Sequence, residues 1–271
     1  MRIALNNKDF YIEEYDFDTD FLNCLLKEPN AIQTIDMYTY NSDYSTDTIL
    51  TNFRCGWEKP LPKIKEAISV SMNHFTKGDY KRSKLVNSVV GCRPNVPNYC
   101  MKLPLTMYKN VVDYKKQPVI SIYYDFGVSA NIEAGQKEEK SAKVLAKICE
   151  LEKRGYRVRL NAVFCSRSCF SKRQYVGFYF PLKNESQLLD LKRVSFPIIS
   201  TDMLRVLTFA YLNMLDARNN QLGTFDKVGK GFAIGRDDYS IHYFLSNIKR
   251  PNERCYYLSY YTDLDKVFND L

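Results

Sequence analysis

The sequence predicts an α/β protein organised around a mostly parallel sheet, and three successive elements support this prediction. Residues Pro118 to Tyr124 are rich in Val, Ile and Tyr, which predicts a buried strand. A helix is expected from Gln136 to Arg154, and a second strand from Tyr156 to Cys165. Because a crossover between strands of one sheet is right-handed, this order predicts two parallel strands joined by a helix.

The helix expected from Gln136 to Arg154 is amphipathic and has a defined end. Residues three and four positions apart share its apolar face, namely Ala142, Leu145, Ile148 and Cys149. Gly155 stands at the position where a left-handed residue commonly ends a helix. We therefore expect this helix to cover one face of the sheet.

A third strand is expected from Gln174 to Leu182. The short basic loop before it predicts an antiparallel pairing with the second strand, at one edge of the sheet. Further elements are expected downstream. They are helices at Ser186 to Arg193, Thr201 to Leu215 and Asp263 to Leu271, a turn at Pro197, and strands at Tyr239 to Leu245 and Cys255 to Tyr261.

Composition divides the chain into three expected regions. They are an acidic N-terminal arm (1–49), a helical and Pro-rich region (50–115) and the α/β domain (116–271). We expect the arm to be mainly helical or irregular. In the second region, a helix is expected from Pro62 to Phe75. Gly and Pro residues between Asn87 and Met107 predict a crossing loop or linker with little regular secondary structure.

The net charge of +8 is unevenly distributed along the chain. Residues 1–49 carry three cations and ten acids, a net charge of −7, which leaves 36 cations and 21 acids, or +15, for residues 50–271. Such a basic body attracts anionic partners, most often nucleic acid. The alternative is that the charge serves solubility alone.

Several classes of protein are not favoured by the sequence. With two His and no G-x-S-x-G turn, a Ser-His-Asp hydrolase is not expected, and no G-x-x-x-x-G-K-[ST] loop is present to hold a phosphate. No apolar run reaches the roughly 18 residues of a membrane span. The eight cysteines are scattered and no secretory leader opens the sequence, so we expect reduced thiols, no membrane association and a cytoplasmic location.

The order of the expected elements, with Asp125-x-x-x-Ser129 after the first strand, resembles a von Willebrand factor A domain. The resemblance implies a doubly wound sheet and a Mg²⁺ site with the pattern D-x-S-x-S. Asp125 and Ser129 match the ends of that pattern, Gly127 replaces its middle Ser, and Thr262 with Asp263 loosely resembles its distant Thr and Asp. The alternative is structural: Asp125 accepts hydrogen bonds from the loop and Ser129 caps the helix.

A second resemblance extends from about Phe53 to Leu271. The motifs that carry it are Gly56-Trp57, Gly91-x-x-Pro94-x-Val96-Pro97, Asp125-x-x-x-Ser129, Met203-Leu204-Arg205-x-x-x-Phe209 and Gly229-x-Gly231. In this order they resemble a bacteriophage-encoded protein family of unknown function. The resemblance implies a viral or mobile-element origin and the cytoplasm of a bacterial host, and it implies no activity.

We expect a protein that acts by binding rather than by catalysis, with a host protein, a phage protein or single-stranded nucleic acid as its partner. The basic loop mixes cations with an aromatic residue, as grooves for single-stranded nucleic acid do. The residues expected to contact a partner are Arg167, Lys172, Arg173, Tyr175 and Arg205. Two alternatives stay open: a metal-dependent enzyme centred on Asp125, and a structural virion or assembly protein.

Overall fold

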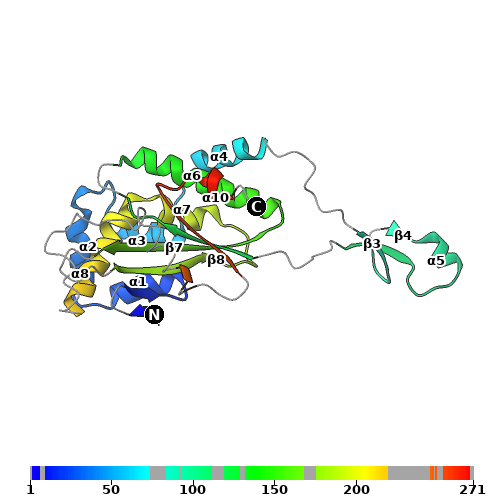
Figure 1. The fold of residues 1–271 in the computed structure, drawn as a ribbon, viewed down its shortest axis with the longest axis horizontal. Coiled ribbons are helices and arrows are strands. Elements are labelled where there is room, and N and C mark those ends of the chain that lie inside the picture. The colour runs from blue at the N-terminus through cyan, green and yellow to red at the C-terminus, as the bar shows by residue number, and fades with distance from the viewer. Residues whose placement is uncertain are drawn as a thin grey trace. The chain divides into compact units, whose positions relative to one another are not determined.

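The computed structural model divides the chain into two compact units (Figure 1). Unit 1 comprises Met1–Asn73 and Pro118–Leu271, and unit 2 comprises His74–Gln117. The residues that the structure describes are 2–6, 10–73, 84–91, 93–111, 119–128, 132–167, 175–218, 245–246, 248 and 253–268. We expected borders near residues 49 and 115. Unit 2 ends close to the second of these, whereas the N-terminal region is part of unit 1.

Unit 1 contains one mixed sheet and most of the helices. Its strands are β1 (Arg2–Asn6), β2 (Phe10–Glu14), β6 (Val119–Asp125), β7 (Arg157–Arg167), β8 (Tyr175–Lys183) and β9 (Arg254–Ser259). Its helices are α1 (Asp18–Leu26), α2 (Ala31–Tyr38), η1 (Thr39–Asn41), α3 (Thr46–Cys55), α4 (Leu61–Asn73), α6 (Ala134–Lys153), α7 (Leu191–Ile199), η3 (Met203–Thr208), α8 (Phe209–Arg218) and α10 (Leu264–Phe268). η3 is a π-helix that leads directly into α8.

The sheet of unit 1 has the strand order β1-β2-β8-β7-β6-β9. β6 pairs with β7 and with β9 in parallel, and β7 pairs with β8 antiparallel, which confirms the expected strand-helix-strand unit and the hairpin after it. The expected place of β8 at the sheet edge is wrong, because β2 pairs with it in parallel. The antiparallel strand at the edge is β1.

The N-terminal region contains the helices α1 and α2, in keeping with the expected helical character, but it also supplies two strands that were not expected, β1 and β2. The β2 side chain that breaks the apolar alternation is Glu13, which is 1% exposed. Its carboxylate accepts hydrogen bonds from the hydroxyls of Tyr11 (3.1 Å), Tyr15 (2.7 Å) and Tyr211 (2.7 Å). A buried carboxylate is tolerated where its oxygens are hydrogen-bonded, so β2 can enter the core with Glu13 facing inward.

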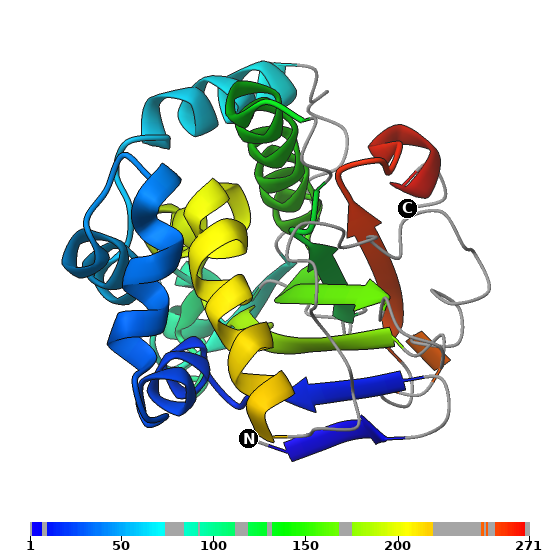
Figure 2. The same cartoon turned by 90° about the vertical axis from the view of Figure 1, so that its left-hand side faces the viewer.

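The two faces of the sheet are covered differently. Helices α1 to α4 and α6 to α8 lie together on one side (Figure 2), where they share a large apolar core with alternate residues of the strands. The opposite face carries a smaller cluster that includes Tyr123, Tyr179 and Tyr257. Within the described chain, only Leu245 and Ile248 pack on that cluster from outside the strands. The described helices are thus gathered on one face, and helices on both faces, as in a doubly wound sheet, are not seen among the described residues.

Helix α6 ends where the sequence predicts, whereas α7 lies at a different place from the expected helix. Gly155 has φ of 89° and follows α6 as expected, and the Gly155 and Tyr156 amides donate to the carbonyls of Glu152 and Leu151. The expected helix from Ser186 to Arg193 is wrong: α7 spans Leu191–Ile199 and includes Pro197. Asp190 caps its start, and its apolar residues are buried in the core.

Unit 2 contains a small antiparallel sheet and one short helix. Its elements are β3 (Lys84–Ser88), β4 (Arg93–Pro94), α5 (Val96–Cys100) and β5 (Met107–Val111), with strand order β3-β5-β4. The expectation of little regular structure between Asn87 and Met107 is wrong. Pro94 lies on an edge strand and Pro97 lies in the first turn of α5, two places where a missing N–H costs little.

Gly91 and Asn95 hold this small unit together. A Cβ atom at Gly91 would lie 2.1 Å from the Tyr108 carbonyl oxygen, so only glycine allows this close approach to β5. The Asn95 amide group donates to Asn87 Oδ1 (2.9 Å), and its oxygen accepts from the Asn98 backbone N–H (3.2 Å). Motif residues between Gly91 and Pro97 therefore build unit 2.

Three further expectations concern the C-terminal half of the chain. The helix expected from Thr201 to Leu215 is present, with the π-helix η3 at its start. The strand expected from Cys255 to Tyr261 and the helix after it are present as β9 and α10. The strand expected from Tyr239 to Leu245 lies outside the described residues, except for Leu245.

The described helices were also compared with the requirements of a membrane span. None of them alone has the length and the apolar composition to cross a bilayer. The bent pair formed by Leu191–Ile199 and Met203–Leu215 meets those requirements only when the two segments are taken together.

Candidate functional site

Asp125 ends strand β6, which lies between β7 and the edge strand β9, and the carboxyl ends of parallel strands in an open sheet commonly bind ligands. The register places it between Val163 of β7 and Ser259 of β9. Its side chain is fully buried, and each carboxylate oxygen has a donor. The Gly127 backbone N–H donates to Oδ1 (2.8 Å), and the Tyr257 hydroxyl donates to Oδ2 (2.6 Å).

The surroundings of Asp125 weaken its ionisation. Burial raises the pKa of Asp125 to about 7, and the hydrogen bonds from Tyr257 and Gly127 oppose this rise. Burial also lowers the pKa of Lys137, in the first turn of α6, to about 7, with Arg205 acting in the same direction and Asp125 in the opposite one. The Lys137 ammonium donates to the Ser200 carbonyl oxygen at 2.8 Å. Two buried groups of opposite sign thus share this end of the sheet.

The described residues at this edge do not fit a Mg²⁺ ion. Both oxygens of Asp125 are already hydrogen-bonded within the protein, and a side chain at Gly127 would place its Cβ 2.9 Å from Asp125 Oδ1. Thr262 Oγ1 accepts the Ser259 N–H (2.8 Å), and Asp263 Oδ1 accepts backbone N–H groups of α10. Ser129 lies outside the described residues.

The other described residues also offer no site for a metal ion. Within the described ranges, no group of three or more His, Cys, Asp or Glu side chains could hold a metal ion. None of the six cysteines that the structure describes forms a disulfide. Asp125 accepts a loop N–H, as the structural alternative expects, whereas the helix cap expected at Ser129 is wrong, because α6 begins at Ala134 with Glu133 as its N-cap.

The residues expected to contact a partner are only partly described. Arg167 and Tyr175 face each other in the register of β7 and β8, at the ends of the two strands. Lys172 and Arg173 lie outside the described residues. Arg205 is exposed on η3, and its charge acts on Lys137. The structure thus places the backbones of Arg167 and Tyr175 opposite each other on neighbouring strands.

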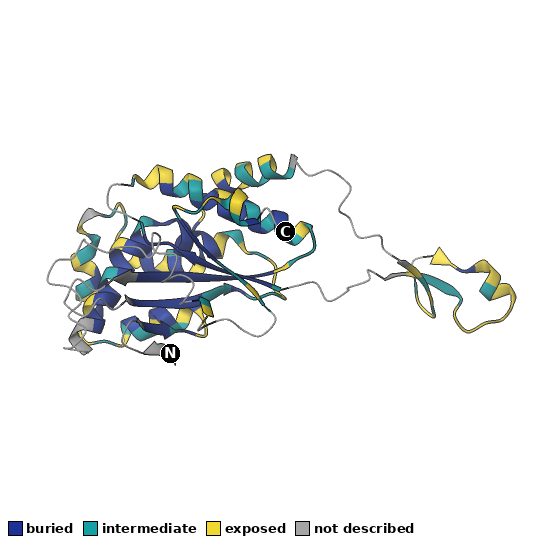
Figure 3. Ribbon diagram, viewed as in Figure 1, coloured by how far each residue is buried: buried dark blue, intermediate teal, exposed yellow. Residues whose placement is uncertain are grey.

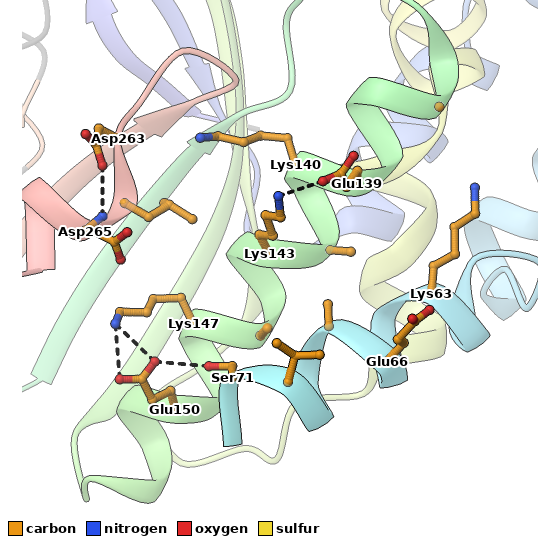
Figure 4. Close-up of a pocket in the computed structure, with 16 residues that line it drawn as sticks. Lys63, Glu66, Ser71, Glu139, Lys140, Lys143, Lys147, Glu150, Asp263 and Asp265 are labelled. Carbon is orange, nitrogen blue, oxygen red and sulfur yellow. Dashed lines mark hydrogen bonds and ion pairs between the residues drawn. The ribbon is translucent and has the colours of Figure 1, made fainter. Parts of the chain in front are cut away.

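A groove of about 810 Å³ lies beside α6 in unit 1 (Figure 4). Its apolar lining includes Ala67, Val70 and Leu264. The charged residues that line it are Lys63, Lys140, Lys143, Lys147, Glu66, Glu139, Glu150, Asp263 and Asp265. Because four cations face five acids, and two of the cations pair with acids of the same helix, the groove favours neither sign of ligand.

Unit 2 shows a different surface, because most of its described residues are exposed or half-buried (Figure 3). Its exposed large apolar residues are Leu85, Val89, Val90, Val96, Tyr99, Met101, Leu103 and Leu105. Among its described side chains, only Asn95 is buried. Arg93, Lys102 and Lys109 are exposed on the same unit, and residues 84–111 contain no Asp or Glu. This combination makes unit 2 the candidate interaction surface.

This surface is not among the expected sites, although the sequence carries a signal for it. Residues 74–117 contain nine cations and two acids, a net charge of +7 out of +8 for the whole chain. We averaged the charge over residues 50–271, which hid this concentration in 44 residues. A scan with a shorter window would have located it.

The comparisons with known proteins identify a family. No curated protein and no solved structure matches the chain. The family model described as "Domain of unknown function (DUF7192)" matches residues 6–270. That match includes the strand-end residues around Asp125, both units and the exposed surface of unit 2. The chain therefore belongs to the DUF7192 family.

Proposed function

We propose that this protein acts by binding an anionic macromolecule rather than by catalysis, and that unit 2 provides the contact surface. The observation that carries the proposal is the surface of unit 2, where eight large apolar side chains and exposed cations occur without an acid in residues 84–111. Contiguous exposed apolar surface usually marks a site of interaction. Cations around it select an anionic partner.

The size of unit 2 supports this proposal. It has 44 residues, and chains of about 40 residues seldom build a core that is stable without a disulfide, a metal or a partner. Its described part buries Asn95 and no apolar side chain. A partner that covers the exposed side chains would add the apolar burial that the unit itself lacks.

We also propose the fold of the body, the origin of the protein and the place where it acts. We propose a von Willebrand factor A-like body, a phage or mobile-element origin, and action in the cytoplasm of a bacterial host on a host protein, a phage protein or nucleic acid. The motif order from Phe53 to Leu271 supports the origin, and the parallel β6-α6-β7 unit supports the body. Unit 1 then serves as the scaffold that carries the binding unit.

The test is a comparison of two triple variants of the full chain. In one, Arg93, Lys102 and Lys109 of unit 2 are replaced by Gln; in the control, Arg54, Lys65 and Lys153 of unit 1, which are also exposed, are replaced by Gln. Both lose the same net charge. We expect the unit 2 variant alone to lose affinity for heparin and for oligonucleotides, measured by fluorescence anisotropy, because only it loses phosphate or sulfate contacts.

Equal losses in the two variants would show that binding follows net charge and not unit 2. Wild-type protein that binds no polyanion at low salt would also contradict the proposal.

A further inference from the structure

Unit 2 limits what its partner can be through the sign of its charge. Nine cations and two acids between residues 74 and 117 give it a net charge of +7. A second copy of this surface would bring like charges together, which is unfavourable at an interface. The partner must therefore be anionic, and its charges must be numerous enough to match several cations.

The apolar side chains add a second requirement. Val89 and Val90 are 66% and 76% exposed in the turn between β3 and β4, and Met101 is 62% exposed after α5. A partner that offers only charges would leave these side chains in water and would gain nothing from them. The partner must therefore present apolar surface between its charges.

Tyr99 indicates which kind of apolar surface fits. It is 71% exposed on α5, and the exposed cation Lys102 follows three residues later, with its backbone N–H donating to the Tyr99 carbonyl oxygen (3.0 Å). Aromatic side chains beside cations bind single-stranded nucleic acid, because each nucleotide combines a flat base with a phosphate. In a duplex the base faces are stacked inside, and only the backbone and the groove edges are accessible.

We propose that unit 2 binds single-stranded nucleic acid, with its exposed cations on the phosphates and with Tyr99 and the neighbouring aliphatic side chains against unpaired bases. This inference rests on the proposed function and names the class of partner. The base contacts are independent of sequence, because every base has an apolar face. An acidic protein segment is the competing partner, and the experiment below separates the two.

The experiment measures the affinity of the full chain for four fluorescent probes by anisotropy. The probes are a single-stranded oligonucleotide of about 20 nucleotides, an abasic strand of equal length, a duplex of the same sequence and an acidic polypeptide, each at about 50 and 200 mM salt. We expect the single strand to bind at least about tenfold more tightly than the abasic strand, since stacking on aromatic residues contributes that much per base.

Two single variants locate the base contact. Tyr99→Ser removes the exposed ring of unit 2, and Tyr40→Ser removes a ring that is 90% exposed on unit 1. We expect Tyr99→Ser to weaken binding of the single strand about tenfold and to leave the affinity for the abasic strand unchanged. Tyr40→Ser should change neither affinity. Circular dichroism confirms that both variants fold, since neither residue is buried.

The possible outcomes separate this inference from the proposed function. Equal affinity for the normal and abasic strands, or tighter binding of the acidic polypeptide, would overturn the inference and leave binding through unit 2 intact, provided that the unit 2 cations are still required. An unchanged affinity of Tyr99→Ser for the single strand would also overturn it. Failure to bind any of the four probes would overturn both.

Discussion

In unit 1 most apolar side chains of the sheet and the helices are buried, whereas in the described part of unit 2 eight large apolar side chains are exposed and no apolar side chain is buried. Phe178 of β8 is an example from unit 1. It is fully buried, and the centroid of its ring lies 4.5 Å from the ring centroid of Phe21 and 4.6 Å from that of Tyr211. Tyr99 of α5, 71% exposed, is an example from unit 2.

The difference between the units concerns stability and function. Burial of apolar surface is the main favourable term in folding, so unit 1 uses its apolar residues to stabilise itself. Unit 2 leaves the same residue types available to a partner, and it is held together by backbone pairing and by the polar contacts of Asn95. Substitutions should therefore affect folding in unit 1 and binding in unit 2.

The largest expected effect comes from the same substitution in both units. Leu160→Ala in β7 removes a fully buried side chain, and we expect the free energy of unfolding to fall by about 2 to 5 kcal/mol. Leu103→Ala in unit 2 removes a side chain that is 44% exposed, and we expect a change below about 1 kcal/mol. Urea denaturation of the full chain measures both. Similar losses would remove the contrast between the units.

The next effect tests the buried carboxylate of unit 1. Glu13→Gln keeps the shape of the side chain but places an amide NH₂ among three tyrosine hydroxyls that donate to the carboxylate. We expect the free energy of unfolding to fall by about 2 kcal/mol, since hydrogen bonds to a charged acceptor are the stronger ones. A variant as stable as wild type would show that the negative charge of Glu13 does not contribute to the stability of these hydrogen bonds.

The pH dependence of stability tests the strand end of unit 1. The pKa of Asp125 is about 7 in the folded protein and lower in the unfolded chain, so between pH 4 and 7 the folded state holds the extra proton. The free energy of unfolding should therefore fall as pH rises through this range, by up to about 1.4 kcal/mol per pH unit from this group. Asp125→Asn should flatten the curve. An equal slope in the variant would contradict the assignment.

The smallest effect compares two helix ends. Gly155 after α6 and Lys102 after α5 both have positive φ, 89° and 55°. Gly155→Ala should lower the free energy of global unfolding by about 1 kcal/mol, because a side chain is disfavoured there. Lys102→Gly should raise the free energy of local opening of α5, measured by amide hydrogen exchange, by a similar amount. It should leave the free energy of global unfolding unchanged. A global effect of Lys102→Gly would show that the two units unfold together.

The elements that could be predicted from the sequence are those in which local pattern and packing agree. β6, α6, β7 and β8 have continuous apolar or amphipathic patterns, and Gly155 marks the end of α6, so their order and pairing followed from the residues alone. β2 could not be predicted, because Glu13 at a core position interrupts the alternation that identifies a strand. Three tyrosines make that position acceptable, and although Tyr11 and Tyr15 are two residues away, Tyr211 is 198 positions distant and no local pattern shows its contact.

The candidate site was predicted only in part. Asp125 was correctly placed at a buried strand end, but its hydrogen bond with Tyr257 joins residues 132 positions apart, and no local pattern shows such a contact. Unit 2 was missed because Pro94 and Pro97 indicated a loop, whereas an edge strand and a helix start accept proline. Its concentration of cations was visible in the sequence.

The central claim is that unit 2, and not unit 1, contacts the partner. Hydrogen exchange of the full chain with and without a single-stranded oligonucleotide tests this claim most directly, because it reports both units in one measurement. We predict that the oligonucleotide slows exchange in residues 84–111 and leaves the exchange rates of β6, β7 and β8 unchanged. Slower exchange at the carboxyl end of β6 or at the ends of β7 and β8, with residues 84–111 unchanged, would contradict the claim.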